Sequence, residues 1–121
     1  MNNFSAGSTR NIVLASCSGI GKTSLAEALL SSCGVTASLD FEPEEIEKKM
    51  TMNSKVASFT RKTDRINLVD TPGYSIFLAD TKNAMRAVDG AIFLTSAVPE
   101  LKVEAERIWN ILRERNIPTI V

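Results

Sequence analysis

The stretch NIVLASCSGIGKTSLAEALLSS, residues 11–32, decides the fold class. Residues 12–15 form a short apolar run, which is typical of a strand buried on both faces. Residues 16–21 are rich in glycine and serine and indicate a loop. From about residue 22 to 32, Leu25, Ala28 and Leu29 recur at i, i+3 and i+4 and predict a helix, which Gly34 can end. Strand, glycine-rich loop and helix in this order are typical of a phosphate-binding site.

The loop itself, SCSGIGKT over residues 16–23, follows the Walker A spacing G-x-x-x-x-G-K-[ST] except at its first position. Ser16 stands there instead of glycine, and a positive φ at this position would cost about 1 kcal/mol. Lys22 would reach the β- and γ-phosphates, and the Thr23 hydroxyl would bind Mg²⁺. Backbone N–H groups would surround the phosphates. The candidate nucleotide-binding residues are Ser16, Cys17, Ser18, Gly19, Ile20, Gly21, Lys22, Thr23 and Ser24.

The rest of the chain alternates strand and helix signals. We expect strands over 52–59 and 66–69 that pair as an antiparallel hairpin, and further strands over 91–94 and 117–121. Helices are predicted over about 80–88 and along the apolar stripe Leu101, Ala105, Ile108, Trp109 and Leu112. Pro43 and the acids after it would open a short helix or belong to a mobile segment, and the acidic run over 40–47 is interpreted as a solvated switch helix rather than a metal site. This order predicts an α/β P-loop NTPase fold: a mostly parallel sheet, helices on both faces and one antiparallel edge hairpin.

A second motif, Asp70-Thr71-Pro72-Gly73, follows the strand predicted over 66–69. Asp70 would hold Mg²⁺ through water at the end of that strand. Gly73 would let a backbone N–H approach a γ-phosphate. Alone, D-x-x-G also fits a plain turn, but one hairpin after a phosphate loop it indicates a second part of the same site. Asp70, Thr71, Pro72 and Gly73 are therefore further nucleotide-binding candidates.

Composition narrows the classes of function. Lys and Arg number 14, as do Asp and Glu, so the net charge of zero argues against non-specific binding of nucleic acid or membranes. The absence of histidine excludes an imidazole base or ligand. No apolar run is long enough to span a bilayer, and two cysteines suggest a cytoplasmic protein with reduced thiols. Cys17 would be either a reactive thiol that bound nucleotide protects or a buried inert one; Cys33 is expected to pack at the helix end.

Residues 11–23, 40–52 and 66–73 resemble the GTPase domain of elongation factor G and its relatives, among them the ribosomal-protection proteins and elongation factor G-like paralogues. The similarity runs through nearly the whole chain from about residue 10. The family's Arg-Gly-Ile-Thr switch run corresponds to Lys48-Lys49-Met50-Thr51, which implies that Thr51 closes over Mg²⁺ and the γ-phosphate. The resemblance implies Mg-GTP binding and hydrolysis, with the ribosome as a partner through the full-length protein. The metal candidates are then Thr23, Thr51 and Asp70.

Three departures from the family bear on mechanism. The segment before Asp40 is shorter than usual, and Lys49 replaces a glycine, which would stiffen the switch. Tyr74 stands where elongation factor G carries its catalytic histidine. A phenol titrates near pH 10 and is a poor base at neutral pH, although it can hydrogen-bond to water. We therefore expect slow hydrolysis in isolation, with Lys22, Thr51 and Tyr74 as the catalytic candidates.

Two other functions fit the same residues. One is a nucleotide-binding switch or interaction module with little or no hydrolysis. The other, a small P-loop kinase, is disfavoured because Thr51 and the Asp70 motif fit a γ-phosphate switch better. We expect residues 1–9 to be a flexible N-terminus and residues 10–121 a partial GTP-binding domain, because the guanine-reading Asn-Lys-x-Asp motif would follow the last strand. An incomplete sheet would leave apolar surface uncovered and favour self-association.

Overall fold

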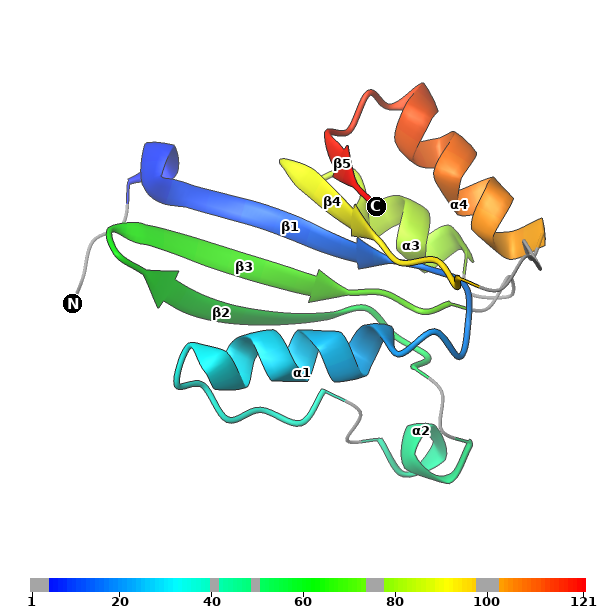
Figure 1. Cartoon of the computed structure of the whole chain (residues 1–121), viewed down its shortest axis with the longest axis horizontal. Helices are drawn as coiled ribbons and strands as arrows, with labels where there is room; N and C mark the ends of the chain where they lie inside the picture. Colours follow the sequence, from blue (N-terminus) through cyan, green and yellow to red (C-terminus); the bar gives the residue numbers. More distant parts are fainter. Residues whose placement is uncertain (1–4, 40–41, 49–50, 74–77, 98–102) are drawn as a thin grey trace.

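The computed structural model describes residues 5–39, 42–48, 51–73, 78–97 and 103–121 (Figure 1). Within these ranges one sheet has the strand order β2-β3-β1-β4-β5. The β1 strand pairs in parallel with β3 and β4, β4 pairs in parallel with β5, and β2 and β3 are antiparallel. The predicted mostly parallel sheet with an antiparallel edge hairpin is confirmed. The elements are a 3₁₀ turn at Ala6–Ser8, β1 (Thr9–Ala15), α1 (Lys22–Ser32), α2 (Pro43–Lys48), β2 (Lys55–Arg61), β3 (Asp64–Asp70), α3 (Leu78–Ala84), β4 (Gly90–Phe93), α4 (Val103–Glu114) and β5 (Thr119–Ile120).

Two apolar cores lie on opposite faces of the sheet, because successive side chains of β1 point to opposite faces. Val13 and Ala15 pack with residues of β4 and α4 in one core, which we call the α4-side core. Leu14 packs with α1 and with Leu68 of β3 in the other, the α1-side core. Figure 1 shows α1 on one side of the sheet and α3 and α4 on the other. Helices on both faces were predicted, and the structure confirms them.

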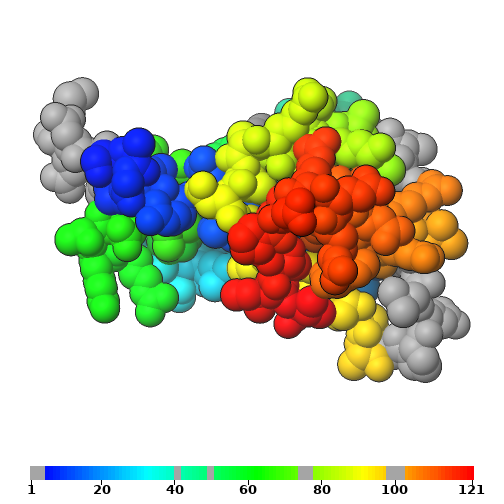
Figure 2. All heavy atoms as spheres, turned by 90° about the horizontal axis from the view of Figure 1, so that it is seen from above, coloured from blue at the N-terminus to red at the C-terminus, as the bar shows by residue number. Residues whose placement is uncertain are grey.

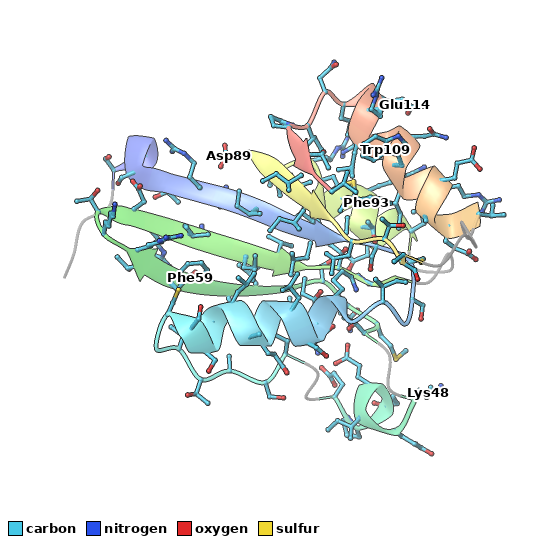
Figure 3. All side chains as sticks on the ribbon, viewed as in Figure 1. Lys48, Phe59, Asp89, Phe93, Trp109 and Glu114 are labelled. Atoms are coloured by element: carbon cyan, nitrogen blue, oxygen red, sulfur yellow. The ribbon has the colours of Figure 1, made fainter. Side chains whose placement is uncertain are left out.

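The apolar stripe of α4 faces the sheet as predicted. Ala105, Ile108 and Leu112 are buried. Ile111, which the predicted stripe does not include, is buried beside them. The Trp109 ring packs on Phe93 of β4 with the ring centroids 5.5 Å apart (Figure 3). Trp109 is thus part of the α4-side core, as expected. Leu101 lies outside the described residues.

Three local predictions were wrong. Ala28 of α1 is exposed, and the buried face carries Lys22, Ala26 and Leu30, with Leu25 and Leu29 beside it. The apolar pattern did not identify this face because its first residue, at position i of the buried i, i+4, i+8 row, is a lysine. Helix α3 ends at Ala84 rather than 88, where Arg86 and Ala87 N–H groups donate to the carbonyls of Asn83 and Ala84. Cys33 is exposed at the C-terminal cap of α1 instead of packed.

The end regions show smaller differences. Of the N-terminus expected to be flexible, residues 1–4 lie outside the described residues, Ala6–Ser8 form a 3₁₀ turn and Thr9 already belongs to β1. The segment after Pro43 is helical and forms α2. In the part of the chain that the structure describes, we find no helix with the length and apolarity that crossing a membrane would require.

The β2–β3 hairpin connects the segment that follows Thr51 to Asp70, the last residue of β3. Its register pairs Lys55 with Asp70 at one end and Arg61 with Asp64 at the turn. Lys62 in that turn has φ 57°. Figure 2 shows the turn in green at the opposite end of the molecule from α4. The open end of the hairpin therefore brings the segment that follows Thr51 next to the last residue of β3.

Candidate nucleotide-binding site

The phosphate loop joins the end of β1 to the start of α1. Gly19 and Gly21 have φ values of 81° and 88°, a backbone region that side chains other than glycine rarely adopt. Gly21 is the N-terminal cap of α1, and its carbonyl accepts a hydrogen bond from the Leu25 N–H at 2.9 Å. The backbone of the loop therefore lies at the N-terminus of α1, the positive end of the helix dipole, where anions bind.

Ser16 does not carry the backbone strain considered from the sequence. Among the described residues other than glycine, only Lys62 and Asn116 have a positive φ. Ser16 is fully buried, and its Oγ donates a hydrogen bond of 2.8 Å to the Cys17 carbonyl. Serine at this position therefore needs no left-handed backbone conformation, and the strain expected from the sequence is absent.

A cavity of about 520 Å³ opens beside the loop. Four predicted nucleotide-binding residues do not line it: Ser16, Asp70, Thr71 and Pro72 are buried instead. Four residues that the sequence analysis did not single out do line it: Glu27, Ser38, Glu45 and Ile46. The candidates that line it are Cys17, Ser18, Gly19, Ile20, Gly21, Lys22, Thr23, Ser24, Thr51 and Gly73.

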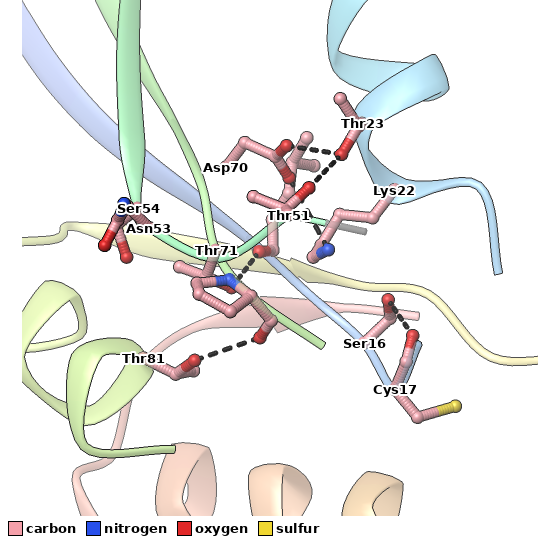
Figure 4. Close-up of polar contacts among 12 residues, drawn as sticks. Ser16, Cys17, Lys22, Thr23, Thr51, Asn53, Ser54, Asp70, Thr71 and Thr81 are labelled. Atoms are coloured by element: carbon pink, nitrogen blue, oxygen red, sulfur yellow. Dashed lines mark hydrogen bonds and ion pairs between the residues drawn. The ribbon is translucent and has the colours of Figure 1, made fainter. Parts of the chain in front are cut away.

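Three oxygen-bearing side chains from separate parts of the chain meet at the base of the phosphate loop (Figure 4). Thr23 Oγ1 of α1 donates to Asp70 Oδ2 at 2.6 Å. Thr23 Oγ1 also lies 2.9 Å from Thr51 Oγ1. Since a threonine hydroxyl has one proton, Thr51 is the donor in this second bond. The three metal candidates predicted from the sequence are therefore brought together.

Lys22 lies on the other side of the Asp70 carboxylate. Its Nζ is 3.7 Å from Asp70 Oδ1, and the two side chains are 7% and 0% exposed. Attraction between opposite charges increases with such burial because less water screens it. The loop lysine is thus already oriented at the base of the cavity that it lines.

Contacts on three sides hold the turn at residues 70–73. Thr71 Oγ1 donates to the Leu14 carbonyl of β1 at 2.8 Å, and Thr81 Oγ1 of α3 donates to the Pro72 carbonyl at 3.1 Å. At Gly73, a Cβ atom would lie only 2.7 Å from the Ser18 nitrogen. Gly73 is therefore needed for a close approach of this turn to the phosphate loop. Tyr74 lies outside the described residues, and so does Lys49.

The sequence pattern gives no sign of the role that Glu45 has in the structure. The acidic run over 40–47 was interpreted as solvated, but the Glu45 side chain is fully buried. Its Oε1 accepts hydrogen bonds from the Met52 N–H at 2.9 Å and the Asn53 N–H at 3.4 Å, and its Oε2 pairs with Lys55. Burial alone would raise the pKa of Glu45. Lys55 and the backbone N–H groups together lower the pKa by more than burial raises it, so the pKa is below the ordinary 4.5.

This lowered pKa predicts an acid-sensitive contribution to stability. A carboxyl group whose pKa is lower in the folded chain stabilises it above the unfolded pKa, and this stabilisation is lost as the pH falls through the folded pKa. We expect Glu45→Gln to lower the free energy of unfolding near neutral pH by about 3 kcal/mol, because one partner of a buried pair is removed. Below about pH 4 the difference from wild type should shrink.

Urea unfolding of both chains over this pH range measures the effect. Glu44→Gln is the matched control, because Glu44 is exposed on the same helix. A difference between wild type and Glu45→Gln that stays constant or grows in acid would contradict the prediction.

Cys17 is 5% exposed and belongs to the α4-side core. This burial fits the inert alternative better than the reactive one, since a reactive thiol has to be reached by its reagent. Protection of Cys17 by nucleotide stays a prediction.

Four features of this site define the class of P-loop nucleotide-binding domains. They are a strand, a loop with two glycines of positive φ, a helix that begins at the loop, and a buried carboxylate that accepts a hydrogen bond from the helix threonine. The family model described as "Elongation factor Tu GTP binding domain" matches residues 7–121. The chain belongs to this family.

Curated relatives agree with this assignment. Ribosome-releasing factor 2, mitochondrial, of Schizosaccharomyces pombe is 30% identical over 98% of this chain and 16% of its own length. Tetracycline resistance protein TetM of Streptomyces lividans is 37% identical over 93% of this chain and 19% of its own. The elongation factor G-like protein of Mycobacterium tuberculosis H37Rv is 34% identical over 95% and 18%. The chain therefore spans less than a fifth of these relatives.

Solved structures show the same fold. A protein from Thermus thermophilus superposes with a TM-score of 0.82 at 31% identity, over 90% of this chain and 18% of that one. Translation elongation factor SelB from Methanococcus maripaludis, solved with the GTP analogue GPPNHP, has a TM-score of 0.74 at 24% identity, over 93% and 21%. The resemblance to the GTPase domain of elongation factor G-like proteins and the predicted fold class are confirmed.

Proposed function

We propose that this chain binds Mg-GTP and hydrolyses it as the G domain of an elongation factor G-like translation factor. One observation carries the proposal: the Thr23 and Thr51 hydroxyls and the Asp70 carboxylate meet at the base of a phosphate loop. These groups come from α1, from the segment before β2 and from the end of β3. Such convergence of distant positions in the sequence is expected of a nucleotide switch and not of a plain turn.

The donor set fits Mg²⁺. Hydroxyl and carboxylate oxygens are hard ligands of the kind that this ion prefers. We assign Thr23 and Thr51 as its direct ligands and Asp70 as a ligand through water; when bound, the ion neutralises charge that develops on the phosphates. Lys22 would bind the β- and γ-phosphate oxygens. The N–H groups of residues 16–24 would surround the phosphates, and Gly73 would present its own to the γ-phosphate.

For hydrolysis, we assign Lys22, Thr51 and Tyr74 to the catalytic group. Thr51 would close over the γ-phosphate, and Tyr74 would orient the attacking water by a hydrogen bond without removing its proton. Because a phenol titrates near pH 10, we expect slow hydrolysis by the chain alone. Single-turnover hydrolysis measures this rate, and rapid cleavage without any partner would contradict the assignment of Tyr74.

The ribosome is the partner that we propose for the full-length protein. Support comes from relatives whose names describe ribosome release and elongation. The cytoplasmic location predicted from the sequence stays a prediction, since some relatives are named as mitochondrial. Self-association also stays a prediction.

Equilibrium binding of fluorescent GTP, GDP and ATP, with and without Mg²⁺, tests the proposal. We expect GTP and GDP to bind, with tighter binding when Mg²⁺ is present, because an ion held by the Thr23 and Thr51 hydroxyls and by Asp70 would offset the negative charge of the phosphates. Circular dichroism and thermal unfolding confirm that the chain is folded. A folded chain that binds none of the three nucleotides would contradict the proposal.

A further inference from the structure

A buried charge pair contacts the backbone directly after Thr51. Glu45 is fully buried, and the Lys55 side chain that pairs with it is 9% exposed. The pair joins α2 to the first residue of β2 and so spans the segment that contains Thr51. Removing two charges from water is costly, and it is offset only where geometry and further hydrogen bonds compensate. Here those bonds go to the N–H groups of the two residues that follow Thr51.

Two more contacts of this segment lie further along the chain. The Ser54 N–H donates to Asp80 Oδ2 at 2.6 Å, and Lys55 then enters the β2 ladder opposite Asp70. Before these contacts, the Glu45 carboxylate receives the backbone N–H groups of residues 52 and 53. Thr51 precedes them by one peptide unit, and its hydroxyl lies 2.9 Å from Thr23 Oγ1. The Glu45 carboxylate therefore holds the backbone directly after the residue whose hydroxyl contacts Thr23.

We propose that Glu45 and Lys55 are positioning residues for Thr51: their buried pair holds the backbone after Thr51 so that its hydroxyl faces Thr23 and Asp70. The inference rests on the proposed function, in which Thr51 senses the γ-phosphate. It also couples α2 to the nucleotide, because Glu45 and Ile46 of this helix line the same cavity as Lys22. A change in the bound phosphates that moves Thr51 therefore moves α2 as well.

The test separates positioning from general stability. Affinities for fluorescent GDP and for a non-hydrolysable GTP analogue are measured with Mg²⁺ on wild type, Glu45→Gln, Lys55→Gln and Lys55→Arg, at a temperature where each chain is folded. For the first two variants we expect the preference for the GTP analogue over GDP to fall about tenfold, the size of one lost charged hydrogen bond. Affinity for GDP should fall less than affinity for the GTP analogue, because GDP has no γ-phosphate for Thr51 to contact and only the proposed contact of Thr51 with Mg²⁺ would be lost.

Two controls give the result its meaning. Lys55→Arg keeps the charge and should keep most of the preference, whereas Glu44→Gln removes an exposed carboxylate from the same helix and should keep all of it. Equal losses of GDP and GTP-analogue affinity in Glu45→Gln would overturn the inference and indicate a structural role. If that chain does not fold, an unchanged preference in Lys55→Gln has the same meaning. A folded wild type that binds neither nucleotide would overturn the proposed function itself, and this inference with it.

Discussion

Replacing Lys22 by alanine is expected to weaken binding of GTP and GDP by about a hundredfold or more, the combined value of two charged hydrogen bonds. The Lys22 side chain is 7% exposed at the base of the cavity, with its charge 3.7 Å from the Asp70 carboxylate. A bound diphosphate would meet this charge with little water to screen it. Fluorescent-nucleotide titration with Mg²⁺ measures the loss.

Two further variants show whether the charge at this position is responsible. Lys48→Ala removes an exposed lysine from α2 and should leave affinity unchanged. Lys22→Arg keeps the charge but in a broader, planar group and should recover only part of the binding. Because Lys22→Ala leaves Asp70 without its cation, its free energy of unfolding has to be measured too. A folded Lys22→Ala chain with wild-type affinity would show that the cavity does not bind phosphate through this loop.

Gly73→Ala is expected to act by steric exclusion. The added Cβ would lie 2.7 Å from the Ser18 nitrogen and 2.8 Å from the Cys17 carbonyl carbon, both of them backbone atoms that cannot rotate away. We expect the free energy of unfolding to fall by about 1–3 kcal/mol, as in other overpacked sites. We also expect the preference for a GTP analogue over GDP to disappear, because the turn must withdraw from the phosphate loop.

The matched control is Gly34→Ala, at a glycine with φ 78° and no atom within 4 Å of the added Cβ. It carries the backbone strain of a left-handed position without a steric clash, so it should lower stability but leave nucleotide preference intact. Urea unfolding and nucleotide titration of both variants measure the two effects separately. Unchanged preference in Gly73→Ala would contradict the assignment of this turn to the γ-phosphate side of the site.

The parts of the site that were predictable from the sequence depend on local geometry. Gly19, Gly21 and Lys22 are close together along the chain, so a strand, a loop and a helix are enough to place them. Asp70 follows from the rule that functional groups gather at the carboxyl ends of parallel strands. Fold class follows in the same way, since short apolar runs alternating with amphipathic stretches indicate a sheet covered by helices.

Glu45 could not be found in this way. A glutamate among other acids near a proline fits a solvated helix, and its burial depends on Lys55, ten positions later, and on backbone N–H groups whose direction no side-chain pattern encodes. The backbone conformation at Ser16 was also not predictable from the sequence. The motif suggested a strained position, but φ there depends on how the loop leaves β1, and serine is accommodated without strain.

The β2–β3 hairpin determines where a label can be inserted without changing the site. The two strands begin and end at the site, while their turn around Lys62 lies six residue pairs away, about 20 Å along the strands. Residues added in the turn lengthen the tip, whereas one residue added within either strand would shift the pairs between the insertion and the site and turn those side chains to the other face. The tip is therefore the place for a fluorophore or an epitope tag that reports on the chain while the spacing between Thr51 and Asp70 stays as it is.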